Sequence, residues 1–243
     1  MNWGLCLPAL KAINPSLLES LKGMTMSTLT KFALSLIGRN RPKPPKGEAT
    51  NPITLPPPNT NGGLPLMDAL QKRSSSRQFA NTALPSQMLS DLLWAAFGVN
   101  RPNGSRTAPS ALNAQEVDVY VAMPSGAYRY DATTHTLHLV AASDLRHVTG
   151  YQDFVDDAPM DLVYVADPER MALMPAEQRV FFAAASAGAI AQNVYLFSAS
   201  NGLSTVIRAW LDRKAIAAAL GLNPDHQVLL SQTVGFPSDN TKA

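Results

Sequence analysis

A run of arginines and serines begins at Arg73, directly after a predicted helix that starts near Leu66, and ends at Arg77. The guanidinium group of arginine presents a planar set of N–H donors that matches the oxygens of a phosphate. Serine hydroxyls and backbone N–H groups can complete the shell around such an anion. We therefore interpret the run as a candidate phosphate-binding turn. The alternative is an ordinary basic helix end in solvent, where positive charge is favourable next to the helix dipole.

A second polar run extends from Arg106 to Gln115, just ahead of a predicted core strand. Amide side chains both donate and accept hydrogen bonds, so Asn113 and Gln115 suit the edge of a planar heterocycle. The alternative is that Ser110 caps a short helix and that the two amides stabilise turns. The residues alone leave both interpretations open.

Most familiar catalytic motifs are absent from the sequence. It has no GxxxxGK[ST] phosphate loop, no GxGxxG after a strand, no GxSxG elbow and no HExxH. Its four histidines lack the spacing of metal ligands, and its single cysteine, Cys6, cannot form an intramolecular disulfide. We therefore expect no metal site. His135 and His138 fall in or beside a short predicted strand, where we expect them to face solvent.

The composition is that of a globular protein with one main domain, since 46% of the 243 residues are hydrophobic and 16% are charged. Seven basic and two acidic residues lie in positions 1–50, and the rest of the chain has a net charge of −3. That remainder gives no electrostatic argument for binding nucleic acid. Seven prolines between Arg41 and Pro58 favour an extended linker or surface arm.

We assign residues 1–60 to a basic, proline-rich N-terminal extension and residues 61–243 to the functional domain. Because the extension lacks apolar periodicity, we expect it to add nothing to the core, so that a chain beginning near Asn59 would still fold.

Residues beyond Gly63 show the mixed periodicities of an α+β domain. Apolar stripes predict one helix before Lys72 and a second from Ser86 to Gly98. Strands are predicted at 117–123, 128–130, 137–140, 161–167 and 228–234. The first three form an antiparallel meander, and the fourth is apolar on both faces, which favours a central position.

No charged residue lies between Arg179 and Arg208. Amide side chains interrupt this run, and Gly202 ends its helical part, so we interpret it as a helix buried in the core or at a subunit interface. Alanines such as Ala187 and Ala191 would let another helix approach closely. We expect no membrane-spanning segment and a cytoplasmic location, with export through the basic leader left open.

Together these segments resemble the nitroreductase family of FMN-dependent flavoproteins, over most of residues 60–237. The family's R-R-S-x-R-x-F start stands here as residues 73–79, with Ser74 in place of the second arginine, and its P-S-x-x-N-x-Q element as residues 109–115. Further similar pieces are residues 150–155 with Ala158-Pro159, the strand ending at Asp167, and residues 192–196, 202–206 and 232–237. The chain looks most like the branch that holds the thiazoline and oxazoline dehydrogenases.

The resemblance implies a sandwich in which a mixed, largely antiparallel sheet is surrounded by helices, and a homodimer with FMN at the subunit interface. It implies that Arg73, Ser75 and Arg77 hold the FMN phosphate and that Ser74 lines the same turn. Asn113 and Gln115 would face the ribityl chain and pyrimidine edge, and the backbone amides of Ala209 and Trp210 would contact flavin N5 and O4.

The activity implied by the resemblance is that of an FMN-dependent oxidoreductase. It would transfer hydride between NADH or NADPH, or an organic donor, and a small planar acceptor such as a nitroaromatic or a quinone. The indole of Trp210 would narrow the pocket, unless it is simply a core residue. The alternative function is a non-catalytic or regulatory flavin-binding protein, which Ser74 favours, as does a C-terminal tail whose only basic residue is Lys242.

Overall fold

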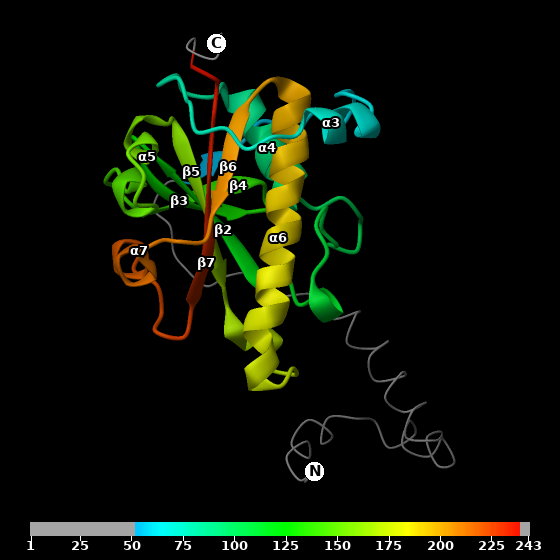
Figure 1. Cartoon of the computed structure of the whole chain (residues 1–243). Helices are drawn as coiled ribbons and strands as arrows, with labels where there is room; N and C mark the ends of the chain where they lie inside the picture. Colours follow the sequence, from blue (N-terminus) through cyan, green and yellow to red (C-terminus); the bar gives the residue numbers. More distant parts are fainter. Residues whose placement is uncertain (1–51, 239–243) are drawn as a thin grey trace, which may run out of the picture. The chain divides into compact units, whose positions relative to one another are not determined.

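The computed structural model describes residues 52–238. The expectations about Cys6, the basic leader and Lys242 lie outside the described residues. Seven described strands form one sheet in the order β1-β4-β3-β2-β5-β7-β6, and every neighbouring pair is antiparallel (Figure 1). The strands are β1 (Ile53–Thr54), β2 (Val117–Met123), β3 (Gly126–Asp131), β4 (Thr136–Ala141), β5 (Met160–Ala166), β6 (Ser204–Arg208) and β7 (Gln227–Gly235). The expected α+β sandwich with a largely antiparallel sheet is confirmed.

Helices cover both faces of this sheet. The described α-helices are α3 (Leu66–Lys72), α4 (Ser86–Phe97), α5 (Phe154–Asp157), α6 (Ala176–Asn201) and α7 (Arg213–Ala219), with short 3-10 turns η2 (Ala111–Asn113), η3 (Arg146–Val148) and η4 (Pro168–Met171). The main core lies where α4 and α6 pack on one face, and a smaller cluster lies under α7 on the other. Figure 1 shows α6 and α7 on opposite sides of the strands.

Helix α6 is the long uncharged helix expected from the sequence. It ends at Gly202, whose φ of 68° is a left-handed conformation that glycine adopts without strain. Ala187 and Ala191 are buried against the chain's own core, so these two alanines pack within the fold rather than at a subunit interface. Among the described helices, α6 alone is long and apolar enough to cross a membrane by length and composition, and 39% of that stretch is buried in the fold.

The residues just before position 60 pack on the domain. Leu55 is only 5% exposed and belongs to the main core, and β1 pairs with β4. The Ser90 hydroxyl of α4 also donates a hydrogen bond to the carbonyl of Pro56 at 2.6 Å. The expectation that the extension adds nothing to the core is therefore wrong for Leu55, because a single apolar residue between prolines shows no periodicity. The boundary near residue 60 stays a prediction.

His135 does not face solvent as expected. Its Nε2 lies 2.6 Å from the Ser90 hydroxyl and its Nδ1 lies 2.9 Å from the Tyr130 hydroxyl. Burial lowers the pKa of His135. The residue has a positive φ of 53°, so it occupies a turn rather than the strand, and the turn directs the ring inward.

Candidate functional site

The run from Arg73 to Arg77 leaves the end of α3 and continues beside the outer edge of β6. The N–H of Ser76 donates to the carbonyl of Thr205 at 3.0 Å, and the Ser204 hydroxyl donates to that of Ser76 at 3.2 Å. Because β6 is the last strand in the described sheet, its outer edge is free to make these contacts. The run is thus fixed to a strand rather than being only the solvated end of a helix.

Tyr195 of α6 contacts both this turn and β6. Its hydroxyl lies 2.8 Å from the Ser75 hydroxyl and accepts a hydrogen bond from the Ile207 N–H at 3.0 Å. Its ring lies 5.2 Å from the guanidinium carbon of Arg73, a cation–π contact. Tyr195 falls within the matching segment 192–196, but its role depends on contacts over 120 residues in sequence, which a local pattern does not reveal.

The two arginines of the turn are available to a ligand. Within residues 52–238, neither the Arg73 nor the Arg77 guanidinium has a hydrogen-bond or ion-pair partner, and Arg77 is exposed. Ser74 is also exposed beside them. Two free guanidinium groups with neighbouring hydroxyls form an anion-binding arrangement of the kind that suits a phosphate.

Backbone donors continue along the same strand edge. The Thr205 carbonyl and the Ile207 N–H bond outward, to Ser76 and Tyr195, rather than to β7. Strand β6 ends at Arg208, and the next residue, Ala209, is exposed. The Ala209 carbonyl accepts a hydrogen bond from Arg213 Nη2 at 2.9 Å. Ala209 therefore directly follows the strand whose outer edge the turn contacts.

Trp210 lies at the end of this edge and is 79% exposed. Its indole meets the ring of Tyr151 edge to face, with 5.9 Å between the ring centroids. The alternative that Trp210 is a core residue is wrong. An exposed pair of contacting aromatic rings offers a surface to a planar group.

Asn113 and Gln115 lie in a separate loop that is stabilised internally. Gln115 is 3% exposed, and its Nε2 donates to the carbonyl of Gly104 at 2.8 Å and to Oδ1 of Asn113 at 3.1 Å. Its Oε1 accepts from Arg106 Nε at 2.9 Å, and its N–H donates to the Ser110 hydroxyl at 2.8 Å. Gln115 therefore stabilises its own loop, as the alternative interpretation expected, because both of its side-chain N–H donors are used there.

The positive φ values at Leu112, Asn113 and Gln115 show how tightly that loop turns. Among the described residues, the Asn113 Nδ2 has no hydrogen-bond partner, so Asn113 is the amide of this loop that can still bind a ligand. No hydrogen bond or ion pair joins the loop to the Arg73–Arg77 turn within the described part of the chain.

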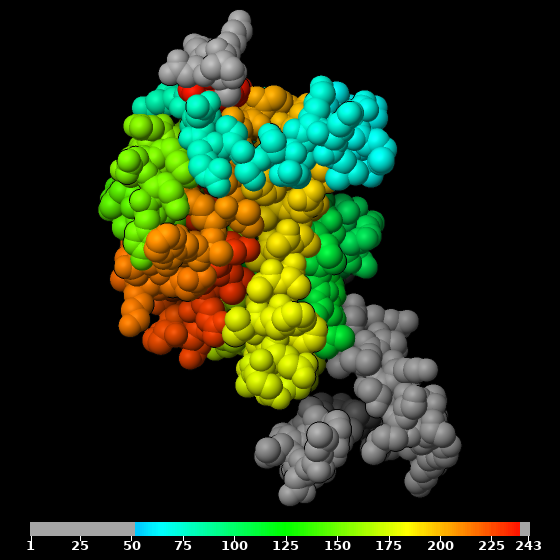
Figure 2. All heavy atoms as spheres, viewed as in Figure 1, coloured from blue at the N-terminus to red at the C-terminus, as the bar shows by residue number. Residues whose placement is uncertain are grey.

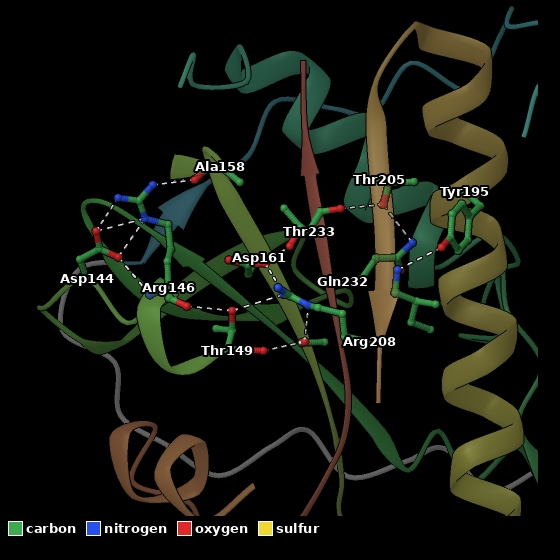
Figure 3. Close-up of polar contacts among 12 residues, drawn as sticks. Asp144, Arg146, Thr149, Ala158, Asp161, Tyr195, Thr205, Arg208, Gln232 and Thr233 are labelled. Carbon is green, nitrogen blue, oxygen red and sulfur yellow. Dashed lines mark hydrogen bonds and ion pairs between the residues drawn. The ribbon is translucent and has the colours of Figure 1, made fainter. Parts of the chain in front are cut away.

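At the C-terminal end of β6 lies a buried ion pair, shown in Figure 3. Arg208 Nη2 lies 2.6 Å from Oδ1 of Asp161, which also accepts a hydrogen bond from the Thr233 hydroxyl. Burial lowers the pKa of Arg208 and raises that of Asp161, while their mutual attraction opposes both shifts. No local sequence pattern indicates this pair, since the two residues lie 47 positions apart.

A groove of about 560 Å³ lies between residues 59–64 and helices α4 and α6. Its lining includes Trp94, Phe197, several asparagines and one charged residue, Asp91. Figure 2 shows residues just before and within α3, in cyan, crossing the end of α6, whose yellow surface is otherwise open on this face. None of the predicted site residues lines this groove.

The family model named "Nitroreductase family" matches residues 70–236, and the chain belongs to this family. Membership in it identifies the protein as an oxidoreductase. Two similar proteins are each described as a "putative nitroreductase". One, from Ralstonia eutropha JMP134, is 50% identical in sequence to this chain. Its crystal structure matches with a TM-score of 0.75, over 82% of this chain and 96% of that chain. The other, from Methanocaldococcus jannaschii, is 31% identical over 151 residues, which cover 58% of this chain and 76% of the relative.

A more distant solved structure shares the fold. The NADPH:FMN oxidoreductase from Vibrio harveyi, complexed with NAD+, is 20% identical with a TM-score of 0.55, over 73% of this chain and 71% of that chain.

Proposed function

We propose that this oxidoreductase binds FMN along the outer edge of β6, with the phosphate in the turn from Arg73 to Arg77. The observation that carries the proposal is that Tyr195 holds this turn against β6, the strand that leads directly into the exposed Ala209. Two guanidinium groups without hydrogen-bond or ion-pair partners among the described residues suit a phosphate, and the N–H of Ala209, just beyond the strand, would suit an acceptor atom of the flavin ring. The residues present therefore fit this cofactor.

When bound, FMN would supply hydride transfer at its N5 atom. The N–H groups of Ala209 and Trp210 would donate to the N5 and O4 region, which favours the reduced ring because negative charge develops there. Tyr151 and Trp210 would restrict the space above the ring to a planar partner. Such a site would admit one partner at a time, since hydride transfer needs an approach to ~3–3.5 Å.

The electron donor that we propose is NADH or NADPH, and the acceptor is a small planar molecule such as a nitroaromatic or a quinone. The name of the Vibrio harveyi neighbour supports this choice, although that structure establishes only the shared fold. The same site can also work in the other direction, as in a dehydrogenase, in which an organic donor is oxidised at a C–H bond. Anaerobic addition of each donor to the flavin-loaded protein separates the two.

A homodimer is part of the proposal. The Asn113 loop and the Arg73–Arg77 turn share no hydrogen bond or ion pair among the described residues, so in this proposal a second copy brings Asn113 to the flavin. The exposed side of α6, which includes Phe181, Ala185 and Gly188, offers an apolar surface for that copy. Gly188 has no atom near the position of a Cβ, which is consistent with close approach of another helix.

A regulatory flavin-binding protein is the second candidate. The observation that favours it is Ser74, an exposed serine at the position of the family's second arginine, which leaves the turn with less positive charge. A flavin that is bound but is reduced by neither nicotinamides nor heterocyclic donors would support this candidate over an enzyme.

The substitution Arg77→Ala tests the phosphate assignment. We expect FMN binding to weaken by about 1.5–3 kcal/mol, the usual loss of a charge-assisted hydrogen bond, which corresponds to roughly tenfold or more in Kd. Lys214→Ala is the matched control, because it removes the same charge from an exposed position on α7. Equal FMN affinity in wild type and Arg77→Ala, measured by flavin fluorescence titration, would remove the assignment.

A further inference from the structure

Arg208 is the last residue of β6, immediately before Ala209, and its side chain turns into the fold instead of toward solvent. It is 7% exposed. The side chain crosses β7, where Nε donates to the Ser231 hydroxyl at 3.2 Å, and reaches Asp161 on β5. One guanidinium therefore ties the end of the edge strand to the two strands beside it (Figure 3).

The same guanidinium also contacts the loop that carries Tyr151. Nη2 donates to the Thr149 hydroxyl at 3.4 Å, and the Thr149 carbonyl accepts from the Ser231 hydroxyl at 2.7 Å. A Cβ at Gly150 would lie 2.8 Å from Nη1, so a larger residue there would require the guanidinium to shift. Arg208 thus fixes both pieces of chain from which the exposed aromatic pair of Tyr151 and Trp210 projects.

Contacts extend from Arg208 toward the phosphate turn as well. The guanidinium carbon lies 5.4 Å from the centroid of the Phe154 ring, and that ring lies 5.6 Å from the ring of Phe79. Phe79 is buried two residues after Arg77, and it shares an apolar cluster with Val206 of β6. A continuous series of side-chain contacts therefore connects Arg208 to the segment that follows the Arg73–Arg77 turn.

Stability alone does not account for this arrangement. A buried ion pair seldom stabilises a fold more than apolar residues of similar volume would, because both charges lose their hydration. Arg208 Nη1 is buried, and so is Gln152 Oε1 near Gly150, and neither atom has a hydrogen-bond partner among the described residues. The guanidinium is a rigid planar group that contacts β5, β7 and the Thr149–Phe154 loop at the same time, and apolar residues of similar volume would not replace these contacts.

We propose that Arg208, held by Asp161, is a positioning residue for the ring end of the flavin site. It sets the N–H groups of Ala209 and Trp210, and the loop bearing Tyr151, relative to the bound ring without touching the ring. This inference rests on the proposed function. Its consequence is that loss of the planar contacts misplaces the donors at N5, so the reduced flavin is less favoured and hydride transfer slows, while the phosphate contacts remain.

The test uses the full-length, FMN-loaded protein and the variants Arg208→Met and Arg208→Lys. The FMN dissociation constant, the midpoint potential against a reference dye, and the rate of flavin reduction by NADH or NADPH are measured for each. We expect Arg208→Met to bind FMN within about threefold of wild type, because Arg208 makes no hydrogen bond or ion pair with the turn in the described residues. Its potential should become more negative, and reduction should slow by about tenfold to a hundredfold.

Arg208→Lys separates position from charge, because lysine keeps the charge but lacks the planar fork. We expect it to recover the potential only in part, and it also serves if Arg208→Met fails to fold. The matched control is Arg146→Met, which removes another arginine–aspartate pair, that with Asp144, and should leave potential and rate unchanged.

Three results would overturn the inference. A folded, FMN-loaded Arg208→Met protein with wild-type potential and rate would exclude a positioning role. Full recovery by Arg208→Lys would show that charge alone acts. A wild-type protein that binds no FMN would overturn the proposed function and this inference together, whereas the first two results leave the proposed function intact.

Discussion

Glu116, fully buried immediately before β2, makes the stability of the fold depend on pH. Burial raises the pKa of Glu116 above its ordinary value of 4.5, and Ser186 and Arg170 oppose this shift only in part. The native carboxyl therefore holds its proton more tightly than the unfolded one. Its contribution to the free energy of unfolding is largest below pH 4.5 and falls as the pH rises toward the native pKa.

We predict that Glu116→Gln removes this fall, because glutamine does not ionise. Compared with wild type, the variant should gain stability between about pH 4.5 and neutral pH. Urea unfolding at both pH values measures the difference. If the free energies of unfolding of variant and wild type differ by the same amount at the two pH values, the raised pKa of Glu116 is contradicted.

At the scale of single residues, the part of the site that could be predicted is the part that is contiguous in sequence. Arg73 to Arg77 form a run, so their shared chemistry is visible without a structure. Tyr195 and Arg208 act through partners tens of residues away, and an apolar helix or strand gives no local sign of such contacts. For Gln115 the prediction from sequence fails in the opposite way. Its side chain is of a type that suits a ligand, but it makes its hydrogen bonds within its own loop.

At the scale of elements, β1 and the residue after it connect the extension to the domain. Leu55 is 5% exposed in the main core, whereas Ile53 of β1 is 44% exposed. We predict that Leu55→Ala lowers the free energy of unfolding by about 2–5 kcal/mol, and that a chain beginning at Asn59 loses at least as much.

Ile53→Ala is the control within the same segment and should change stability by less than about 1 kcal/mol. Chemical denaturation of the three proteins checks this. Equal stability of wild type and Leu55→Ala would restore the earlier expectation of a dispensable arm.

Helices and strands with a regular apolar stripe could be predicted closely from the sequence. Helix α4 between Pro85 and Gly98 and strand β2 are examples, because caps and alternation mark their ends. Two-residue β1 and four-residue α5 are too short for a period to show. The strand order, which places β6 at the edge where the turn can reach it, comes from long-range pairing that no local period contains.

At the scale of the whole molecule, the proposed dimer depends on the open side of α6. Gly188 lies on that side with no atom within 4 Å of a Cβ position, so Gly188→Arg should fold while placing a charge in the interface. We predict that this variant sediments as a monomer and that wild type sediments as a dimer. Lys214→Glu, on the opposite face of the sheet, is the control and should remain dimeric. A monomeric wild type that still binds FMN would contradict the interface.

The central claim is that the edge of β6 binds FMN, and the absorption spectrum of the purified protein tests it most directly. We predict visible flavin bands, and release of FMN in an amount close to one per chain when the protein is denatured. The reason for this expectation is the turn held at the edge of β6, where the Arg73 and Arg77 guanidinium groups have no hydrogen-bond or ion-pair partner among the described residues. A colourless protein that does not bind added FMN, or one that releases FAD, would contradict the account.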